Sequence, residues 1–497
     1  MNNPVNFSDI QGLAAFGYSK LTQACYFLGQ IRDAQAAGQW CMAAPISSAE
    51  YKQSPPDTAL QIGLSASGLR ALGVPESIVN CFSPEFVSGV AGEANRSRRL
   101  GDVGANDPAR WSWGGPNRVP HVVVMLFARQ NLDDFARRVQ DGLWNRAFGN
   151  VIRLDTSNMG GREPFGFRDS ISQPEIDWKQ ELPATGDRID YGNRVAIGEL
   201  LLGYVNEYGK YTDRPLVDAA GDPADDLPAA ENVAGKKDVG RNGTYLVLRQ
   251  LEQDVSGFWR FLDNQARGDA GERDELGAAM VGRTRNGDPR ATLSARAIPG
   301  IHDDSGESQN RFTFEGDPKG ILCPVGAHIR RANPRNADLC GQPRGLVARL
   351  GKKLGIPRAD FGEDLIASTR FHRILRRGRE YGPWLAPEDA LKPAPADDPP
   401  RGLQFACLNA NIARQFEFVQ SAWLMSTRFN GLTGEVDPLL GNCAGNFSIP
   451  SPGGLRRLIT EMPQFITVRG GAYFFLPGLS AVRFLVRAAI AGSGAPG

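Results

Sequence analysis

Histidine is scarce in this sequence, with four among 497 residues, and the seven cysteines contain no C-x-x-C pair. An odd number of scattered cysteines favours reduced thiols over a disulfide framework. Structural zinc sites place cysteines and histidines at short, regular spacings, which are missing here. The sequence therefore argues against both a disulfide-stabilised fold and a zinc site.

Long runs of one residue class are missing as well. The 56 basic and 55 acidic residues nearly balance, and no block of like charge is long enough to form a surface for DNA or RNA. No apolar run reaches the ~18 residues of a membrane-spanning helix. The opening segment MNNPVNFSDIQGLAAFGYSK has neither the basic nor the apolar region of a secretory signal. We therefore expect a globular, cytoplasmic protein that binds neither nucleic acid nor a membrane.

Apolar runs rich in β-branched and aromatic residues predict two strands, HVVVMLFAR at residues 121–129 and TYLVLRQL at residues 244–251. Each run is followed by apolar residues at helical spacing, which predicts helices within residues 131–143 and 252–265. The segment DIQGLAAFGYSKLTQACYFLGQI near the start fits the same order of strand and helix. The unit that opens near residue 244 is therefore compatible with a repeat of one that opens near residue 9.

The length of 497 residues predicts about two to four domains. Residues 213–243 are rich in Pro, Gly, Ala and Asp and lack hydrophobic periodicity, which predicts a long loop or linker. We therefore expect one domain within residues 1–220 and a second within residues 221–497.

Four short segments carry residues that suggest chemistry: GFRDS at 166–170, GAHIRR at 326–331, RILRRGREYG at 373–382 and GLQF at 402–405. Binding a peroxide and breaking its O–O bond requires a histidine on one side of haem iron, and an acid with an arginine on the other side. The acid moves a proton between the two oxygens, and the guanidinium stabilises the negative charge that develops.

Longer stretches around these segments, GFRDSISQP, CPVGAHIRRANPR, HRILRRGREYG and GLQFACLNANIARQFEFVQSAW, resemble the dye-decolourising peroxidases in order and in sequence. The opening DIQGL and the closing FITVRGGAYFFLPGLSAVRFL resemble the ends of that family, so the resemblance covers nearly the whole chain. It implies an α+β fold of two ferredoxin-like domains, each with an antiparallel sheet and peripheral helices. It also implies haem b (iron protoporphyrin IX) in the C-terminal half, and the use of hydrogen peroxide to oxidise dyes, phenols and other bulky organic reductants by one-electron steps.

The resemblance assigns three residues to the reaction. His328 matches the proximal ligand of the haem iron, Asp169 matches the distal acid-base, and Arg376 matches the distal arginine. The family's G-x-x-D-G pattern falls on GFRDS, so that Ser170 stands in place of the last glycine. If the backbone there needs a positive φ, a serine costs roughly 1 kcal/mol or shifts Asp169.

Four further residues are expected beside the haem. Leu403 and Phe405 match apolar residues that wall the distal pocket, although at a spacing of two they are equally typical of a strand core. By charge, either Arg330 or Arg331 is expected to meet a haem propionate.

The residues taken alone leave alternatives open. A histidine beside Ala and Ile is ordinarily a hydrogen-bonded structural residue, and His372 in FHRILRR is a rival iron ligand. If Arg376 reaches the distal face, however, a residue four positions earlier is badly placed to bind iron from the other side. For function, the alternatives are a haem carrier or sensor, or another haem enzyme of the same superfold that acts on chlorite or on porphyrin. The pairing of Asp169 with Arg376 favours a peroxidase over these.

Overall fold

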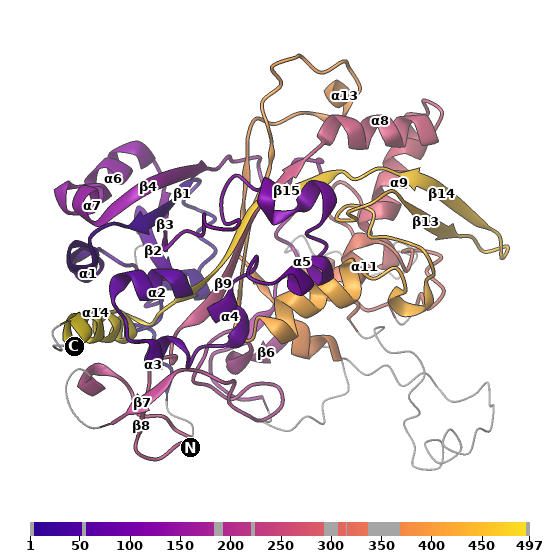
Figure 1. Cartoon of the computed structure of the whole chain (residues 1–497). Coiled ribbons are helices and arrows are strands. Elements are labelled where there is room, and N and C mark those ends of the chain that lie inside the picture. The colour runs from indigo at the N-terminus through magenta and orange to yellow at the C-terminus, as the bar shows by residue number, and fades with distance from the viewer. Residues whose placement is uncertain are drawn as a thin grey trace, which may run out of the picture.

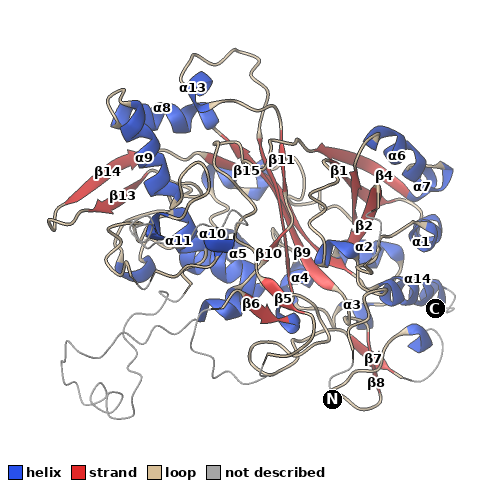
Figure 2. Ribbon diagram, turned by 180° about the vertical axis from the view of Figure 1, so that it is seen from behind, coloured by secondary structure: helices blue, strands red, loops and turns tan. Residues whose placement is uncertain are grey.

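The computed structural model describes residues 4–51, 56–182, 192–219, 224–292, 307–314, 316–335 and 368–493. Within these ranges, nine antiparallel strands form one central sheet with helices around it, an α+β architecture (Figures 1 and 2). The strand order is β10-β12-β9-β15-β2-β3-β1-β4, and β11 pairs with β12. The strands of this sheet are β1 (Gln23–Ile31), β2 (Thr58–Leu64), β3 (Val122–Ala128), β4 (Phe148–Asp155), β9 (Thr244–Gln253), β10 (Leu375–Arg376), β11 (Arg379–Tyr381), β12 (Gly402–Asn409) and β15 (Ile466–Leu476).

The sheet consists of two groups of strands, one from each half of the chain. Strands β1 to β4 form one group, and β9 to β12 with β15 form the other. The groups meet where β15 pairs with β2, with Phe475 opposite Leu64. The expected α+β fold with antiparallel strands and peripheral helices is confirmed, and the two groups agree with a duplicated ferredoxin-like architecture.

Helices gather at both ends of the sheet. Figure 1 shows α1, α2, α6, α7 and α14 at the end that carries β1 to β4, and α5, α8, α9 and α11 near the other end. The α-helices are α1 (Ala34–Ala43), α2 (Ala66–Leu72), α3 (Glu76–Val79), α4 (Pro84–Ser88), α5 (Ala94–Leu100), α6 (Leu132–Val139), α7 (Gly142–Ala147), α8 (Val255–Gln265), α9 (Ala270–Val281), α10 (Glu307–Asn310), α11 (His328–Ala332), α13 (Pro387–Ala390) and α14 (Leu479–Ser493). Two π-helical segments, Ala413–Glu417 and Val419–Leu424, follow β12.

The predicted strand at residues 121–129 is confirmed as β3, and its continuous apolar sequence has a clear cause. Alternate residues belong to two different core clusters, with Val122, Val124 and Leu126 in one and Val123 with Met125 in the other. Successive side chains of a strand point to opposite faces, so a strand covered on both faces has no polar positions.

The predicted helix within residues 131–143 is interrupted. Helix α6 ends at Val139, and α7 begins after Asp141, whose carboxylate accepts hydrogen bonds from the amides of Leu143 and Trp144. An aspartate that caps a new helix competes with continuation of the previous one. The second pair of predictions is confirmed, because β9 is followed by α8, which Asp254 caps.

The predicted linker at residues 213–243 contains a short antiparallel hairpin, β7 (Leu216–Asp218) with β8 (Lys236–Asp238). A buried ion pair between Arg214 and Asp238, 2.5 Å apart, fixes its base. The boundary predicted near residue 220 falls outside the described residues, and the division into residues 1–220 and 221–497 stays a prediction.

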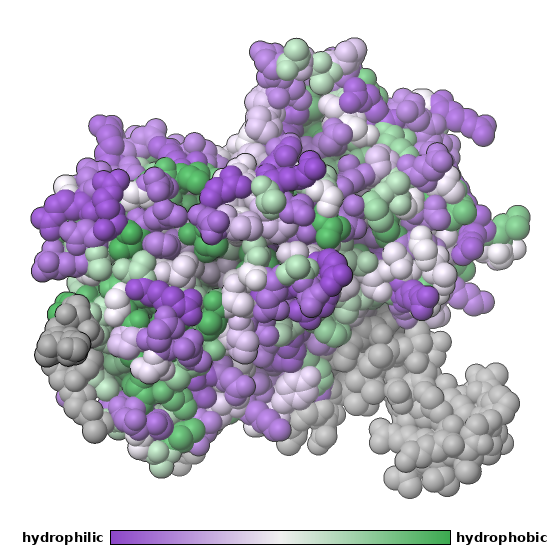
Figure 3. Space-filling model, viewed as in Figure 1, coloured by the Kyte–Doolittle hydropathy of each residue, from purple (hydrophilic) through white to green (hydrophobic). Residues whose placement is uncertain are grey.

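Two further small sheets lie outside the central one: a parallel pair, β5 (Glu175–Asp177) with β6 (Arg194–Ala196), and an antiparallel pair, β13 (Gly445–Pro450) with β14 (Arg456–Met462). The face in Figure 3 is mostly hydrophilic, with apolar residues in small separate groups. Among the described helices, none is both long and apolar enough to cross a membrane.

Candidate active site

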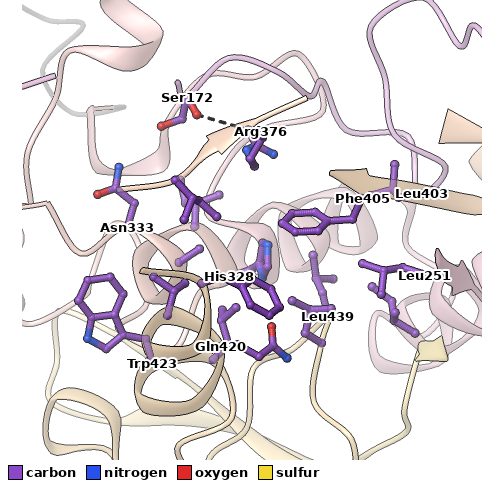
Figure 4. Close-up of a pocket in the computed structure, with 18 of the residues that line it drawn as sticks. Ser172, Leu251, His328, Asn333, Arg376, Leu403, Phe405, Gln420, Trp423 and Leu439 are labelled. Atoms are coloured by element: carbon purple, nitrogen blue, oxygen red, sulfur yellow. Dashed lines mark hydrogen bonds between the residues drawn. The ribbon is translucent and has the colours of Figure 1, made fainter. Parts of the chain in front are cut away.

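A cavity of about 260 Å³ lies between the central sheet and the helices of the C-terminal half. Five of the seven residues predicted for the site line it: His328, Asp169, Arg376, Leu403 and Phe405. Figure 4 shows Arg376 above His328, with Phe405 and Leu403 to one side of both. The fold therefore brings together residues that are up to 236 positions apart in the sequence (405 − 169).

His328 is the first residue of α11, and a quarter of its side chain is exposed, toward the cavity. Its Nδ1 lies 3.1 Å from each carboxylate oxygen of Asp437, which is fully buried. Burial alone would raise the pKa of Asp437, but the neighbouring His328, Arg331 and the Leu440 amide lower it below its ordinary value. The Asp437 carboxylate accepts a hydrogen bond from the Nδ1–H, which leaves Nε2 as the ring nitrogen available to a ligand.

Sequence reasoning missed Asp437. It directly precedes a turn in TGEVDPLLG, 109 residues from His328, and nothing in that segment connects it to a histidine. The amides of Leu439 and Leu440 donate to its Oδ1 at 3.0 and 2.8 Å. These bonds hold the carboxylate in one position, and the carboxylate in turn orients the imidazole.

Asp169 and Arg376 form an ion pair at the cavity, with Oδ1 and Nη1 2.9 Å apart. Arg376 belongs to β10, whereas Asp169 lies in the loop between β4 and β5. Burial would raise the pKa of Asp169, but the Arg376 guanidinium, the Ser170 amide and His328 lower it below its ordinary value. Asp169 is therefore a carboxylate at neutral pH, held beside a permanent positive charge.

Ser170 has φ = +63°, in the left-handed region that glycine adopts without strain. The backbone at this position thus has the positive φ considered in the sequence analysis, and a serine stands where glycine would be favoured. The Asp169–Arg376 pair is nevertheless closed at 2.9 Å, so the serine has not moved the carboxylate away from its partner.

Leu403 and Phe405 lie on one face of β12, opposite Leu251 and Arg249 of β9. All four side chains line the cavity. The sheet thus forms one wall of the cavity, and that wall is mainly apolar at β12.

Arg330 and Arg331 do not lie at the cavity, contrary to the expectation that one of them meets a propionate. Both are almost completely buried. Arg330 bonds to Asp317 and to the carbonyl of Cys323, and Arg331 donates to the carbonyls of Gly326, Trp423, Ser426 and Glu435. Their guanidinium groups anchor α11 to its surroundings.

Other arginines line the cavity instead. Most of them stand in segments already quoted from the sequence, but none was assigned a role there: Arg168, Arg249, Arg283, Arg335 and Arg373. Burial, together with the charges of Arg335 and Arg376, lowers the pKa of Arg283 to about 9. Among the described residues, Nη2 of Arg283 has no hydrogen-bond partner. Bound carboxylates would relieve this concentration of positive charge.

His372, the rival ligand, also lines the cavity. Its Nδ1 donates to the carbonyl of Arg414 at 2.5 Å, and its ring stacks on Phe418 with centroids 3.8 Å apart. Burial lowers its pKa to about 4, so the ring is neutral. Its Nδ1 thus bonds to a carbonyl, whereas that of His328 bonds to a buried carboxylate, the stronger orienting partner for an iron ligand.

The residues of the cavity fit haem. An imidazole oriented by a buried carboxylate suits an axial iron ligand, and apolar walls suit a porphyrin. Arg283, whose Nη2 has no partner within the described part of the chain, suits propionate groups. The donor set found in the structure is therefore the one that haem requires.

Comparisons with known proteins agree with this chemistry, although no family model matches the chain. Dye-decolorizing peroxidase msp1 of Mycetinis scorodonius is 28% identical over 516 residues, which cover 96% of this chain and 87% of that protein. Multifunctional dye peroxidase DyP2 of an Amycolatopsis species is 28% identical over 448 residues, covering 86% of this chain and 82% of that protein.

Solved structures share the fold. A decolorizing peroxidase from Auricularia auricula-judae superposes with a TM-score of 0.71 at 24% identity, covering 97% of this chain and all of that one. A DyP-type peroxidase from Anabaena superposes with a TM-score of 0.68 at 23% identity, covering 96% of this chain and 94% of that one. The chain is therefore similar over almost its entire length to dye-decolourising peroxidases, and it shares the fold of their solved structures.

Proposed function

We propose that this protein is a haem-dependent peroxidase that uses hydrogen peroxide to oxidise dyes, phenolic compounds and other bulky organic reductants by one-electron steps. The observation that carries the proposal is the presence, in one cavity, of His328 bonded to Asp437 and of Asp169 paired with Arg376. The named activities of the relatives support it.

The chain's residues divide the task of holding haem b. His328 would bind the iron through Nε2, and Asp437 would keep the imidazole oriented. Arg283 and Arg335 are the arginines proposed here to meet the propionates. When bound, haem would supply the redox-active iron that accepts oxidising equivalents from peroxide and passes them to reductants one electron at a time.

Asp169 and Arg376 supply the remaining chemistry. As a carboxylate at neutral pH, Asp169 accepts the proton from one peroxide oxygen and returns it to the other, which then leaves as water. The fixed charge of Arg376 stabilises the negative charge that grows on the departing oxygen. Leu403 and Phe405 form an apolar wall of the same cavity, and apolar surroundings strengthen both effects.

Neither a haem carrier nor a sensor requires an acid paired with an arginine beside the bound group. In the part of the chain that the structure describes, no feature of the cavity favours those functions or an enzyme acting on chlorite or porphyrin.

The proposal is tested by loading the purified chain with haem and following the absorbance of a dye after peroxide is added. We expect decolourisation that requires both haem and peroxide, and no decolourisation by the haem-free chain. A chain that takes up haem but oxidises neither dyes nor phenols would instead be a carrier or sensor.

A further inference from the structure

The loop that carries Asp169 contains a second carboxylate that also lines the cavity, Glu163. Its side chain accepts three hydrogen bonds. The amide of Phe165 donates to Oε2 and the amide of Phe167 donates to Oε1, both at 3.0 Å. The third bond comes from Nε2 of Gln253, which donates to Oε2 at 2.9 Å.

The first two bonds close the loop upon itself. The backbone makes the same closure, because the amide of Glu163 donates to the carbonyl of Phe167 and the amide of Gly166 donates to the carbonyl of Glu163. Phe165 and Phe167 are both almost fully buried and pack against α8. Their amides are partly buried, so leaving these donors unpaired would be costly, and the Glu163 carboxylate satisfies them.

The third bond joins the loop to the central sheet. Gln253 is the last residue of β9, which pairs with β12, and β12 pairs with β10, the strand that carries Arg376. Beyond Asp169, Oε1 of Gln173 accepts from the backbone amide of Arg376 at 3.0 Å. The segment with Asp169 is therefore tied to the same sheet on both sides, through Glu163 upstream and Gln173 downstream.

From this geometry we infer that Glu163 is a positioning residue of the peroxidase reaction: through the amides of Phe165 and Phe167 and the side chain of Gln253, it sets where Asp169 stands relative to Arg376. The inference rests on the proposed function, because it assigns Glu163 a role only through Asp169. A displacement of a catalytic group by about 1 Å can cost up to ~10² in rate, so a tie of this kind has a measurable effect.

Glu163→Gln is the direct test in the haem-loaded protein. Glutamine has the same size, but an NH₂ group replaces one of the two carboxylate oxygens. Each of those oxygens accepts a hydrogen bond, and an NH₂ group cannot accept one, so at least one of the three bonds is lost. We expect kcat/KM for peroxide to fall about 10-fold, with unchanged haem content, because the Gln173 tie remains. Hydrogen exchange of the amides within residues 163–169 should become faster, a readout independent of activity.

The matched control is Glu252→Gln, one residue before Gln253. Glu252 points to the opposite face of β9 and pairs with Arg469. This variant should keep the wild-type kcat/KM for peroxide and the wild-type exchange rates.

A double variant distinguishes positioning from a general structural role. If Glu163 acts through Asp169, then Glu163→Gln should cause no additional loss in an Asp169→Asn background. Wild-type kcat/KM in Glu163→Gln, or a full additional loss in the double variant, would overturn the inference. If Glu163→Gln does not fold, Gln253→Met cuts only the tie to the sheet. A decrease of less than about 10-fold in kcat/KM for peroxide in Gln253→Met, absent when Asp169→Asn is also present, then supports the inference. A wild-type kcat/KM in Gln253→Met overturns it.

The proposed function is judged separately, by Asp169→Asn alone. If that variant reacts as fast as wild type, the distal chemistry proposed above is wrong. A loss in Glu163→Gln would then be independent of Asp169, which contradicts the inference as well. If Asp169→Asn is slow while Glu163→Gln is normal, only the inference fails.

Discussion

Asp437 holds the imidazole of His328 with its two carboxylate oxygens 3.1 Å from Nδ1, although 109 residues separate them in the sequence. A histidine held in this way is oriented before any ligand arrives, and its Nε2 is left for the cavity. The relationship distinguishes His328 from His372, whose Nδ1 bonds to a backbone carbonyl.

The first prediction follows from this difference. His328→Ala should give a folded protein with little bound haem, because it removes the axial nitrogen. His372→Ala should keep its haem, since its ring packs on Phe418 and is not the proposed ligand. Haem titration by visible absorbance, with circular dichroism as the control for folding, checks both variants. The opposite result in the two proteins would reverse the ligand assignment.

The second prediction concerns Asp437. Asp437→Ala leaves the imidazole without its orienting partner, which should weaken haem binding by about 10–100-fold. The measurement is a competition for haem between the variant and a haem-binding protein of known affinity. The control is Glu435→Gln, a change at a neighbouring acid whose backbone carbonyl accepts a hydrogen bond from Arg331. Because the substitution leaves that carbonyl in place, the variant should bind haem almost normally. Equal affinity in wild type and Asp437→Ala would show that the bond to His328 is incidental.

The third prediction is a shift in pH dependence. The Asp169 pKa lies below its ordinary value of about 3.9 because Arg376 offsets burial, so Asp169 stays ionised down to lower pH. The acid limb of kcat/KM for peroxide should therefore lie below that value. In Arg376→Leu the limb should move to higher pH, whereas Arg376→Lys, which keeps the charge, should shift it less. A limb at the same pH in all three proteins would exclude Asp169 as the titrating group.

The same lowered pKa has a consequence for stability. Because the folded pKa lies below the unfolded one, the ionised Asp169 stabilises the fold at pH values above the unfolded pKa. This contribution is lost as the pH falls through the folded pKa, and Arg376→Leu should remove most of it.

The fourth prediction concerns Ser170, whose φ of +63° suits glycine better than serine. Ser170→Gly should change the free energy of unfolding by no more than about 1 kcal/mol, because relief of strain and the greater entropy of unfolded glycine oppose each other. Its rate with peroxide should stay close to wild type, since the pair of Asp169 and Arg376 is already closed. A large increase in rate would show that the serine holds Asp169 out of place.

Part of this structure could be predicted from the sequence because the signals are local. The apolar run at β3 and the helical spacing at α8 correspond to burial that each segment achieves along its own length. The break between α6 and α7 was missed, because the apolar spacing continues to Leu143 across the capping residue Asp141. The apolar spacing favours one continuous helix, whereas the Asp141 cap favours a new helix start, and the structure follows the cap.

Within the site, the matched motifs predicted which residues meet in the cavity but not what supports them. Asp437, Glu163 and the arginines of the cavity depend on contacts between distant segments, which no local pattern records. Arg330 and Arg331 show the converse: they follow His328 closely in sequence, yet their buried guanidinium groups bond to Asp317 and to backbone carbonyls and do not line the cavity. The cytoplasmic location expected from the opening segment stays a prediction, which fractionation of the native host would test.

The central claim is that Asp169 and Arg376 together break the O–O bond of peroxide. The most direct measurement is kcat/KM for hydrogen peroxide in haem-loaded wild type, Asp169→Asn and Arg376→Leu, compared at equal haem content. Proton relay and fixed-charge stabilisation are each worth about 10² or more in rate, so we expect Arg376→Leu to lose at least ~10² and Asp169→Asn to be slowed as well. If both variants react with peroxide as fast as wild type, the mechanism is wrong and the protein is a haem carrier.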